Sequence, residues 1–252
     1  MTVRALCWLI RCELLKLWRA PAFSVPTLLF PALFYLMFGL PQADRTIGNV
    51  SVGDYILVAY STFAVMSVGL FAFGVSIAAE RASGWARLLR LTPLSPAAHL
   101  AARLVVAAGF VAAALVLLFS VAAIGTRRAD VFELLLHLLP LLLPGVVPFA
   151  ALGFALGHLC TPGAATAVAN LLFLPLAFAS GLFVPLEYLP SVVQSLAPWL
   201  PSHHLGLLGW SLVDPLPAAS LARSLGMLVV FTAGCMAFAW WAWRRDAAGE
   251  EA

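Results

Sequence analysis

Charged side chains are scarce in this sequence. Of its 252 residues, 10% are Asp, Glu, Lys or Arg and 63% are hydrophobic, whereas soluble domains carry about 25% charged and about 45–50% apolar residues. A well-behaved soluble surface needs roughly 25–35% charged residues. The composition therefore excludes an ordinary soluble domain and indicates a protein surrounded by lipid.

Several chemical motifs are also missing. The single lysine, Lys16, follows a leucine, so the chain has no Gly-x-x-x-x-Gly-Lys-Ser/Thr loop for nucleotide phosphates. Its four cysteines form no Cys-x-x-Cys pair and its five histidines form no His-Glu-x-x-His pattern, which argues against a disulfide framework and a metal centre. We expect no enzymatic activity, no bound cofactor and no nucleic-acid partner for this chain.

Long hydrophobic segments, in contrast, are abundant. A helix needs about 20 mostly apolar residues to cross roughly 30 Å of hydrocarbon. Transmembrane barrels are excluded because their strands alternate apolar and polar residues, whereas Phe110 to Ala123 is apolar except at Ser120. Six segments are predicted to span: Ser24 to Leu40, Tyr55 to Ala79, Leu100 to Ile124, Phe132 to Gly157, Ala164 to Val184 and Ala218 to Trp243.

The predicted spans contain almost no ionisable residues. We take His137, Asn170 and Arg223 as the candidates for a buried polar relay, and Arg223 lies near a helix end. Ion-coupled transporters usually keep such residues within their spans, because each is costly in lipid. The sequence therefore disfavours a proton or sodium relay and predicts an external source of power.

The distribution of basic residues predicts that both chain ends lie in the cytoplasm, since short cytoplasmic loops are enriched in Lys and Arg. Arg127 and Arg128 oppose this rule, but Asp130 and Glu133 are close enough to offset them. The inner segments hold Arg4, Arg11, Lys16, Arg19, Arg81, Arg87, Arg90, Arg103, Arg244 and Arg245, while the outer ones hold Arg45, Arg127, Arg128 and Arg223.

Residues 1–22 have the pattern of an amphipathic helix at the membrane surface. Apolar residues share one face and basic residues the other, with Trp8 and Trp18 placed to sit among lipid headgroups. A simple positively charged anchor is the alternative. The apolar positions are Val3, Leu6, Ile10, Leu14 and Leu17, and the basic ones are Arg4, Arg11, Lys16 and Arg19.

Two connections between spans carry more than a turn. The inner loop after Ala79 predicts a short helix from Trp85 to Leu91 that is stopped by Pro93, with Ser95 and Pro96 starting the next span. The outer connection from Pro185 to Pro217 is apolar but broken by prolines, which predicts a re-entrant or interfacial segment. Its dipping residues would be Leu189, Val192, Val193, Leu196 and Trp199. Prolines 140, 144 and 148 predict a kinked fourth span.

An intramembrane serine hydrolase is a weaker alternative. Ser180 precedes Gly181, and His203 or His204 would have to serve as the base. Phe178 occupies the position where a rhomboid-type Gly-x-Ser-Gly motif has its first glycine, so packing explains Ser180 better.

Three segments in this order resemble the permease subunits of type 2 ABC exporters, and the resemblance covers essentially the whole chain. They are Leu17-Trp18-Arg19-Ala20-Pro21, the inner loop from Glu80-Arg81 to Leu94-Ser95, and the stretch from Gly181-Leu182-Phe183-Val184-Pro185 through Leu189-Pro190 to Trp199-Leu200-Pro201. No single segment carries the resemblance, which rests on their placement between the right spans.

The resemblance implies an all-α membrane protein with one permease domain, 1-252. Its parts would be an amphipathic connecting helix, 1-22, a six-helix membrane region, 24-243, with a cytoplasmic coupling helix and an outer re-entrant segment, and a cytoplasmic tail, 244-252. A separate P-loop ATPase would bind ATP and Mg²⁺, and a second permease copy, identical or related, would complete the pathway in a bacterial inner membrane. Because the spans lack charge, we expect export of a drug, lipid or natural product. Export of a polysaccharide or haem-like molecule, or a non-transporting scaffold, is the alternative.

The resemblance also implies roles for individual residues. The ATPase would dock on Glu80, Arg81, Gly84, Arg87, Arg90 and Pro93. The membrane-interface helix would use Arg4, Arg11, Glu13, Lys16, Trp18 and Arg19, where Glu13 either pairs with Lys16 or meets the ATPase. The pathway would be lined by Tyr55, Tyr60, Phe63, Asn170 and Phe173, for which ordinary helix packing is the alternative. The re-entrant loop would contain Pro185, Glu187, Pro190, Pro198 and Pro201.

Overall fold

The chain folds as a helical bundle, here in a computed structural model that describes residues 3–47, 50–85 and 96–250. Within these residues, six helical segments are long and apolar enough to cross a membrane. The protein is therefore an all-α integral membrane protein, as predicted. The segments are Ser24–Gln42, Val52–Ala82, Ala97–Thr126, Val131–Leu159, Pro162–Ala179 and Ala218–Asp246.

The first helices and the small hairpin are α1 (Val3–Trp18), α2 (Pro21–Phe34) with a π-helical turn (Tyr35–Gly39) and a 3-10 turn (Leu40–Gln42), β1 (Thr46–Ile47), β2 (Val50–Ser51), α3 (Val52–Ala82) and α5 (Pro96–Thr126). The remaining elements are α6 (Val131–Leu142), a 3-10 turn (Leu143–Gly145), α7 (Val146–Leu159), α8 (Pro162–Ala179), α9 (Ser191–Leu196) between short 3-10 turns (Leu186–Tyr188 and Ala197–Trp199), α10 (Pro201–Trp210) and α11 (Ala218–Glu250). The antiparallel hairpin pairs Thr46 with Ser51 and Ile47 with Val50.

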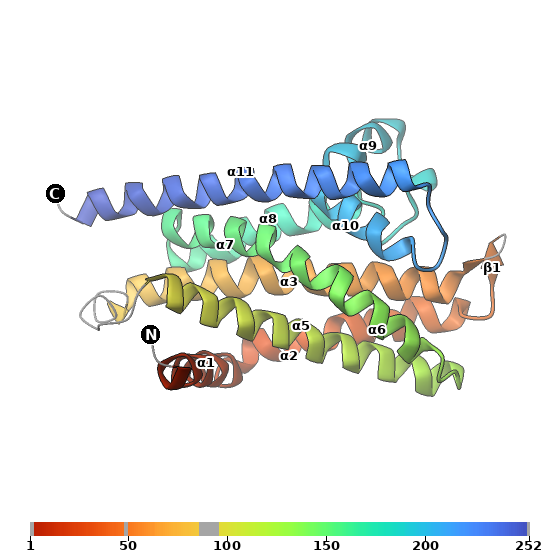
Figure 1. Ribbon diagram of the computed structural model, residues 1–252, viewed down its shortest axis with the longest axis horizontal. Coiled ribbons are helices and arrows are strands. Elements are labelled where there is room, and N and C mark those ends of the chain that lie inside the picture. Colours follow the sequence, from red (N-terminus) through yellow and green to blue (C-terminus); the bar gives the residue numbers. More distant parts are fainter. Residues whose placement is uncertain (1–2, 48–49, 86–95, 251–252) are drawn as a thin grey trace.

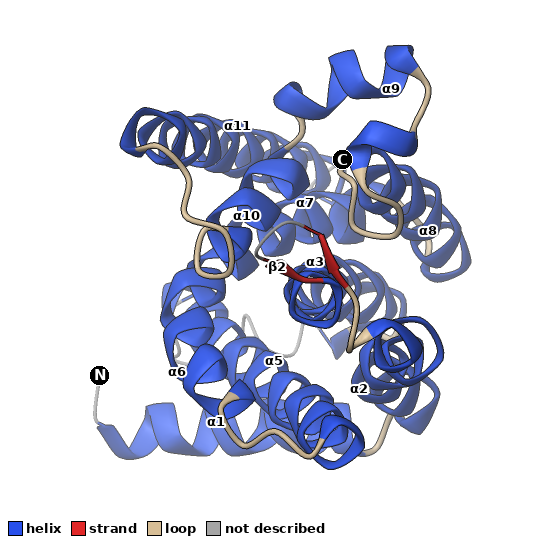
Figure 2. Cartoon of the chain, turned by 90° about the vertical axis from the view of Figure 1, so that its right-hand side faces the viewer, coloured by secondary structure: helices blue, strands red, loops and turns tan. Residues whose placement is uncertain are grey.

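Helix α3 forms the centre of the bundle, with α2, α5, α7 and α8 around it (Figure 2). It is apolar on all faces and most of its length is buried, as expected for a helix surrounded by other helices. Its N-terminus is capped by the Ser51 hydroxyl, which accepts a hydrogen bond from the Asp54 amide at 3.3 Å. Helix α1 lies across one end of the bundle (Figure 2).

Glycines allow α3 and α7 to approach closely. A Cβ atom at Gly153 would lie 2.5 Å from the Leu70 carbonyl oxygen and 3.0 Å from the Gly74 nitrogen. Gly157, one turn later on α7, lies against Ile77 and the Gly74 carbonyl. Small residues promote helix packing in membranes, because they let backbones meet without side chains between them.

The two ends of the bundle differ (Figure 1). The loop end contains α1, the end of α3 at Ala82, the start of α5 at Pro96 and the end of α11; the hairpin end contains β1, the α5–α6 connection and α9. Both chain ends lie toward the loop end, as an even number of spans requires.

The fourth span is broken, as its prolines predicted. The chain leaves α6 at Leu142, passes through the 3-10 turn Leu143–Gly145 and continues as α7. Pro144 lies in this turn, where its missing N–H costs no α-helical hydrogen bond.

One predicted boundary was wrong. The fifth span ends at Ala179 rather than Val184, because Gly181 adopts a left-handed conformation with φ of 82° and turns the chain. The sixth helix continues to Glu250, so most of the predicted tail is helical. Nothing between Trp243 and Ala248 in the sequence is a helix breaker.

The two helices of the outer connection, α9 and α10, are placed differently, and the dipping of α9 toward the membrane stays a prediction. Helix α9 stands away from the bundle (Figure 1), and Val192, Leu196 and Trp199 are exposed. The element that enters the bundle is α10, which packs on α3 and α11. Gly209 of α10 allows this approach, since a Cβ there would lie 2.6 Å from a methyl carbon of Val58.

Candidate functional site

A buried ionic cluster joins three helices at the loop end. Lys16 of α1 contacts Glu13 Oε1 at 2.6 Å and Glu80 Oε1 of α3 at 3.2 Å. Arg103 of α5 pairs with the other oxygen of Glu80, and its Nε lies 3.6 Å from Glu13 Oε2. Arg103 also donates a 3.1 Å hydrogen bond to His99 Nε2, which requires that nitrogen to be unprotonated and the ring neutral. The cluster therefore holds two carboxylates and two cations.

The environment of this cluster strengthens its interactions. The Arg103 side chain is 7% exposed and that of Glu80 is 17% exposed. Buried charges are tolerated only when they are paired and hydrogen-bonded. A neighbouring cavity of about 30 Å³, lined by these charged groups, Ser76 and apolar residues, has room for a water molecule but not for a drug-sized substrate. The cluster is suited to holding helices together rather than to binding a substrate.

A second cluster follows immediately in the sequence. Arg81 pairs with one oxygen of Asp246 on α11 and donates a 3.0 Å hydrogen bond to the carbonyl oxygen of Gly157. The other Asp246 oxygen lies 2.9 Å from His158 Nδ1 on α7. The side chains of Asp246 and His158 are each 10% exposed. This cluster joins α3 to α7 and α11.

The two clusters are built on neighbouring residues at the end of α3 and extend to different helices. Glu80 contacts α1 and α5, whereas Arg81 contacts α7 and α11. The stretch that follows, residues 86–95, lies outside the described residues. Polar contacts from α1, α5, α7 and α11 hold Glu80 and Arg81, the last residues of α3 before this stretch that carry charge.

The predicted docking residues fall into two groups. Glu80 and Arg81 have intramolecular partners, and Gly84 has φ of 75° with no atom within 4 Å of a built Cβ. Docking by these residues stays a prediction. Arg87, Arg90 and Pro93 lie outside the described residues.

The predicted interface helix has exposed aromatic and basic groups. Trp8 and Trp18 are 55% and 80% exposed, and Arg11 lies over the Trp8 ring at 5.2 Å. Arg19 is exposed, and the side chain of Arg4 lies outside the described ones. Glu13 faces α5 and pairs with Lys16, which satisfies one of its two predicted alternatives. The exposed tryptophans suit a headgroup position, which stays a prediction.

Three of the five predicted pathway residues belong to one aromatic cluster. Phe63 lies 4.8 Å from Phe173 and 5.4 Å from Phe183 between ring centroids, and Phe34 contacts both Tyr60 and Phe63. The rings come from α2, α3, α8 and the segment after α8.

The other two predicted pathway residues lie elsewhere. Tyr55 stacks on Trp210 of α10 at 4.7 Å, and the Trp210 indole N–H donates to the Tyr55 carbonyl oxygen at 3.1 Å. Asn170 is exposed on α8 and donates to the Thr166 carbonyl oxygen. Only Tyr60, Phe63 and Phe173 therefore meet in the structure.

The residues predicted for the re-entrant loop are spread over several elements. Pro185, Glu187 and Pro190 flank or lie in the turn before α9, Pro198 lies in the turn after it, and Pro201 begins α10. Of these, Pro201 is buried within the bundle. The carbonyl oxygen of Pro198 accepts a 2.8 Å hydrogen bond from His204 Nε2.

Ser180 has no histidine base. Its hydroxyl bonds to the Ser202 hydroxyl and to the Leu176 carbonyl oxygen, and His203 contacts the backbone oxygen of Ser180 instead. A serine nucleophile requires a base within hydrogen-bond reach of its hydroxyl. The arrangement supports a packing role for Ser180 and gives no support to the hydrolase alternative.

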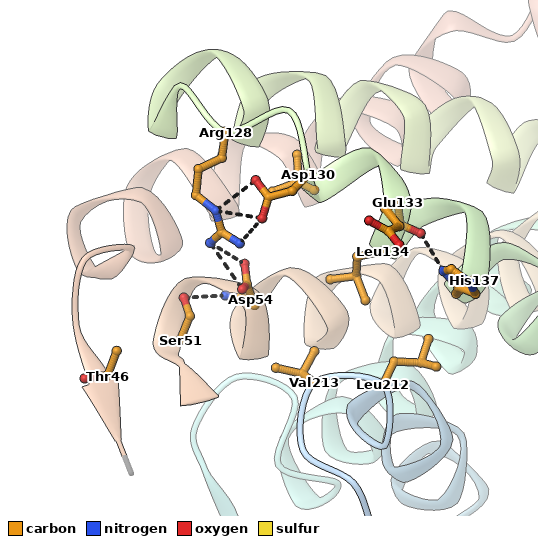
Figure 3. Close-up of a pocket in the computed structure, with 11 residues that line it drawn as sticks. Thr46, Ser51, Asp54, Arg128, Asp130, Glu133, Leu134, His137, Leu212 and Val213 are labelled. Atoms are coloured by element: carbon orange, nitrogen blue, oxygen red, sulfur yellow. Dashed lines mark hydrogen bonds and ion pairs between the residues drawn. The ribbon is translucent and has the colours of Figure 1, made fainter. Parts of the chain in front are cut away.

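A polar cavity of about 490 Å³ opens at the hairpin end. Figure 3 shows Arg128 between Asp54 and Asp130, with Leu212 and Val213 on the opposite wall. Arg128 lies 2.6 Å from Asp130 and 3.2 Å from Asp54. The prediction that Asp130 offsets Arg128 is confirmed, whereas the Glu133 backbone oxygen contacts His137.

The Arg128–Asp130 pair is expected to loosen only in acid. Hydrogen bonds from Arg128 hold the pKa of Asp130 below its ordinary value of 3.8. A carboxylate with a depressed pKa stabilises the folded form above its unfolded pKa and loses this effect as the pH falls through its folded pKa. A spin label at Ala129 in a cysteine-free variant should therefore keep constant mobility from pH 8 to about pH 4. A rise in label mobility between pH 7 and 5 would contradict this assignment. So would a pH dependence of label mobility in Asp130→Asn identical to that of the protein with Asp130.

Sequence reasoning missed several residues of the two ionic clusters. Arg103 was treated as an inner-loop charge, although it lies within the predicted third span and is buried in the structure. The spacing of His99 and Arg103, one helical turn apart, was the available signal. For Asp246 and His158, 88 residues apart in the chain, no local signal existed.

Comparisons with known proteins agree with this architecture. Residues 46–241 match the model of a family described as ABC-2 family transporter protein. The chain is similar to "Putative transport permease YvfS" of Bacillus subtilis (strain 168), with 30% identity over 208 residues that cover 80% of this chain and 82% of that protein. The family match covers more than half of the sequence and includes four complete spans and most of the sixth. The chain therefore belongs to the ABC-2 family of membrane transporter subunits.

Proposed function

We propose that this protein is the permease of an ATP-driven exporter and that a separate P-loop ATPase docks on the loop between α3 and α5. The observation that carries the proposal is the pair of ionic clusters at the base of that loop. A docking loop must transmit the movement of the ATPase to the membrane spans. The neighbouring residues Glu80 and Arg81 link the base of the loop to α1, α5, α7 and α11.

The loop end would face the cytoplasm. It carries most of the basic residues, including Arg11, Lys16, Arg81, Arg244 and Arg245, in agreement with the enrichment of Lys and Arg on the inner side. Arg244 and Arg245 lie over the rings of Trp240 and Trp241 at 4.8 and 5.6 Å, a combination suited to the headgroup region of a bacterial inner membrane.

The aromatic cluster is the proposed wall of the pathway. Phe30 on α2, Phe38 in the π-helical turn that follows it and Phe178 on α8 are about half exposed beside it. A second permease copy facing these helices would enclose an apolar, aromatic space between the two chains. Such a space favours a hydrophobic or amphipathic substrate, such as a drug, lipid or natural product. In the proposed cycle, ATP binding closes two partner ATPases on each other, and each ATPase docks on one of the two permease copies.

Charge reversal in the loop tests the docking site. In a complex with the proposed partner ATPase, Arg87→Glu combined with Arg90→Glu is expected to abolish co-purification and to lower permease-dependent ATP hydrolysis at least about tenfold, because docked charges of the wrong sign repel. The matched control is Arg45→Glu combined with Arg127→Glu, two exposed arginines at the hairpin end. Equal assembly and hydrolysis in all three proteins would remove the loop from the mechanism. A protein that binds no ATPase at all would support the scaffold alternative.

A further inference from the structure

The cluster of Arg81, His158 and Asp246 ties the last helix directly to the central one. Over most of its length α11 packs on α7 and α10, and much of its surface is exposed. At its loop end, however, Asp246 reaches across to Arg81 of α3. Asp246 lies beyond residue 241, where the family match ends, so the family assignment gives it no role.

The geometry at Asp246 is that of a connector between elements. Its two carboxylate oxygens are used by different helices, one by Arg81 and the other by His158 at 2.9 Å. Arg81 in turn holds the Gly157 carbonyl at the end of α7. Because Asp246 is 10% exposed, solvent screens these contacts less than it screens surface ion pairs.

We propose that Asp246 is a positioning residue that acts through Arg81, so that α11 and the base of the loop after α3 move as one unit. This inference rests on the proposed function, since it assigns to the C-terminal helix a part in transmitting the ATPase movement. Without the link, α11 would follow the loop only through α7 and α10. The ATPase cycle would then be poorly coupled to the sixth span even though the complex assembles.

The competing explanation is that the helix end contacts the ATPase directly. A double-mutant cycle separates the two, because residues that act through one another lose their effects non-additively. In lipid nanodiscs with the partner ATPase, Asp246→Ala and Arg81→Ala should each lower permease-dependent ATP hydrolysis about tenfold. The double variant should be no slower than the worse single variant. If the fold-losses of the two single variants multiply in the double variant, the proposal is overturned.

A charge exchange provides the rescue. Arg81→Asp combined with Asp246→Arg restores an ion pair between α3 and α11. The combined variant should recover at least half of the ATP hydrolysis rate that Arg81→Asp alone and Asp246→Arg alone each lose. A docking role for Arg81 itself would not be restored by this exchange, so absence of rescue would overturn the proposal. Asp246→Asn, which keeps an oxygen for Arg81, is the variant to use if Asp246→Ala does not insert.

The matched control is Arg245→Ala, at an exposed neighbour of Asp246, and it should hydrolyse ATP like the wild type. Co-purification with the ATPase should remain within about twofold for Asp246→Ala, Asp246→Asn and Arg245→Ala, since assembly is not what the link provides. Failure of the wild-type chain to assemble with an ATPase would count against the proposed function. A working wild type with an unchanged Asp246→Ala variant would count against this inference alone.

Discussion

Replacing Gly153 by alanine is expected to destabilise the protein by at least about 1–3 kcal/mol, and valine is expected to prevent folding, because added atoms in a packed core force backbones apart. The atoms that the new Cβ would meet are backbone atoms of α3, at 2.5 Å from the Leu70 oxygen and 3.0 Å from the Gly69 oxygen. They cannot rotate away as a flexible side chain would. The measurement is the thermal transition of the detergent-solubilised protein by size-exclusion chromatography.

A glycine on another span serves as the control for Gly153. Gly226 of α11 has no atom within 4 Å of a built Cβ, so Gly226→Ala should be neutral or stabilising by up to about 1 kcal/mol through helix propensity. Equal transition temperatures for Gly153→Ala and Gly226→Ala would show that α3 and α7 do not cross as closely as the structure has it.

Replacing Arg103 by alanine is expected to destabilise the protein by about 3–5 kcal/mol, the usual result of leaving a buried charge without its partner. Arg103 is 7% exposed and bridges Glu80 and Glu13. Without it, two buried carboxylates share the single cation Lys16. Thermal denaturation monitored by tryptophan fluorescence would measure the loss.

Neutralising both partners should restore much of this stability. In Arg103→Met combined with Glu80→Gln, no charge is left unpaired, and such replacements are often close to neutral. Arg45→Ala, at an exposed position, should change stability by less than about 0.5 kcal/mol. A loss at Arg103 as small as that at Arg45 would contradict the buried cluster.

Much of the fold followed from local properties of the sequence. The six spans were visible because crossing lipid requires long apolar segments, and the break in the fourth span was visible because Pro144 cannot donate a helical hydrogen bond. The end of the fifth span was placed five residues late, because an apolar run continues past Gly181, where the backbone turns.

The candidate site was only partly visible in this way. Glu80 and Arg81 were predicted to matter because they begin a charged loop, but the sequence suggested an external partner for both. Their internal partners lie on helices far away in the chain, and Asp246 is 165 residues from Arg81. Arg103 was assigned to topology alone, since a charge near a span end has no partner that the sequence identifies.

Chain composition, hydrophobic segment length and proline placement were sufficient for the membrane environment, the helical class and the number of spans, because each depends on residues adjacent in the chain. The pairing of neighbouring charges with different helices, the glycine contact of α3 with α7, and the burial of α10 instead of α9 depended on three-dimensional packing. In lipid every span is apolar on its surface, so hydrophobic pattern does not reveal which faces meet. Those faces are selected by small residues and buried ion pairs whose partners come together only when the bundle forms.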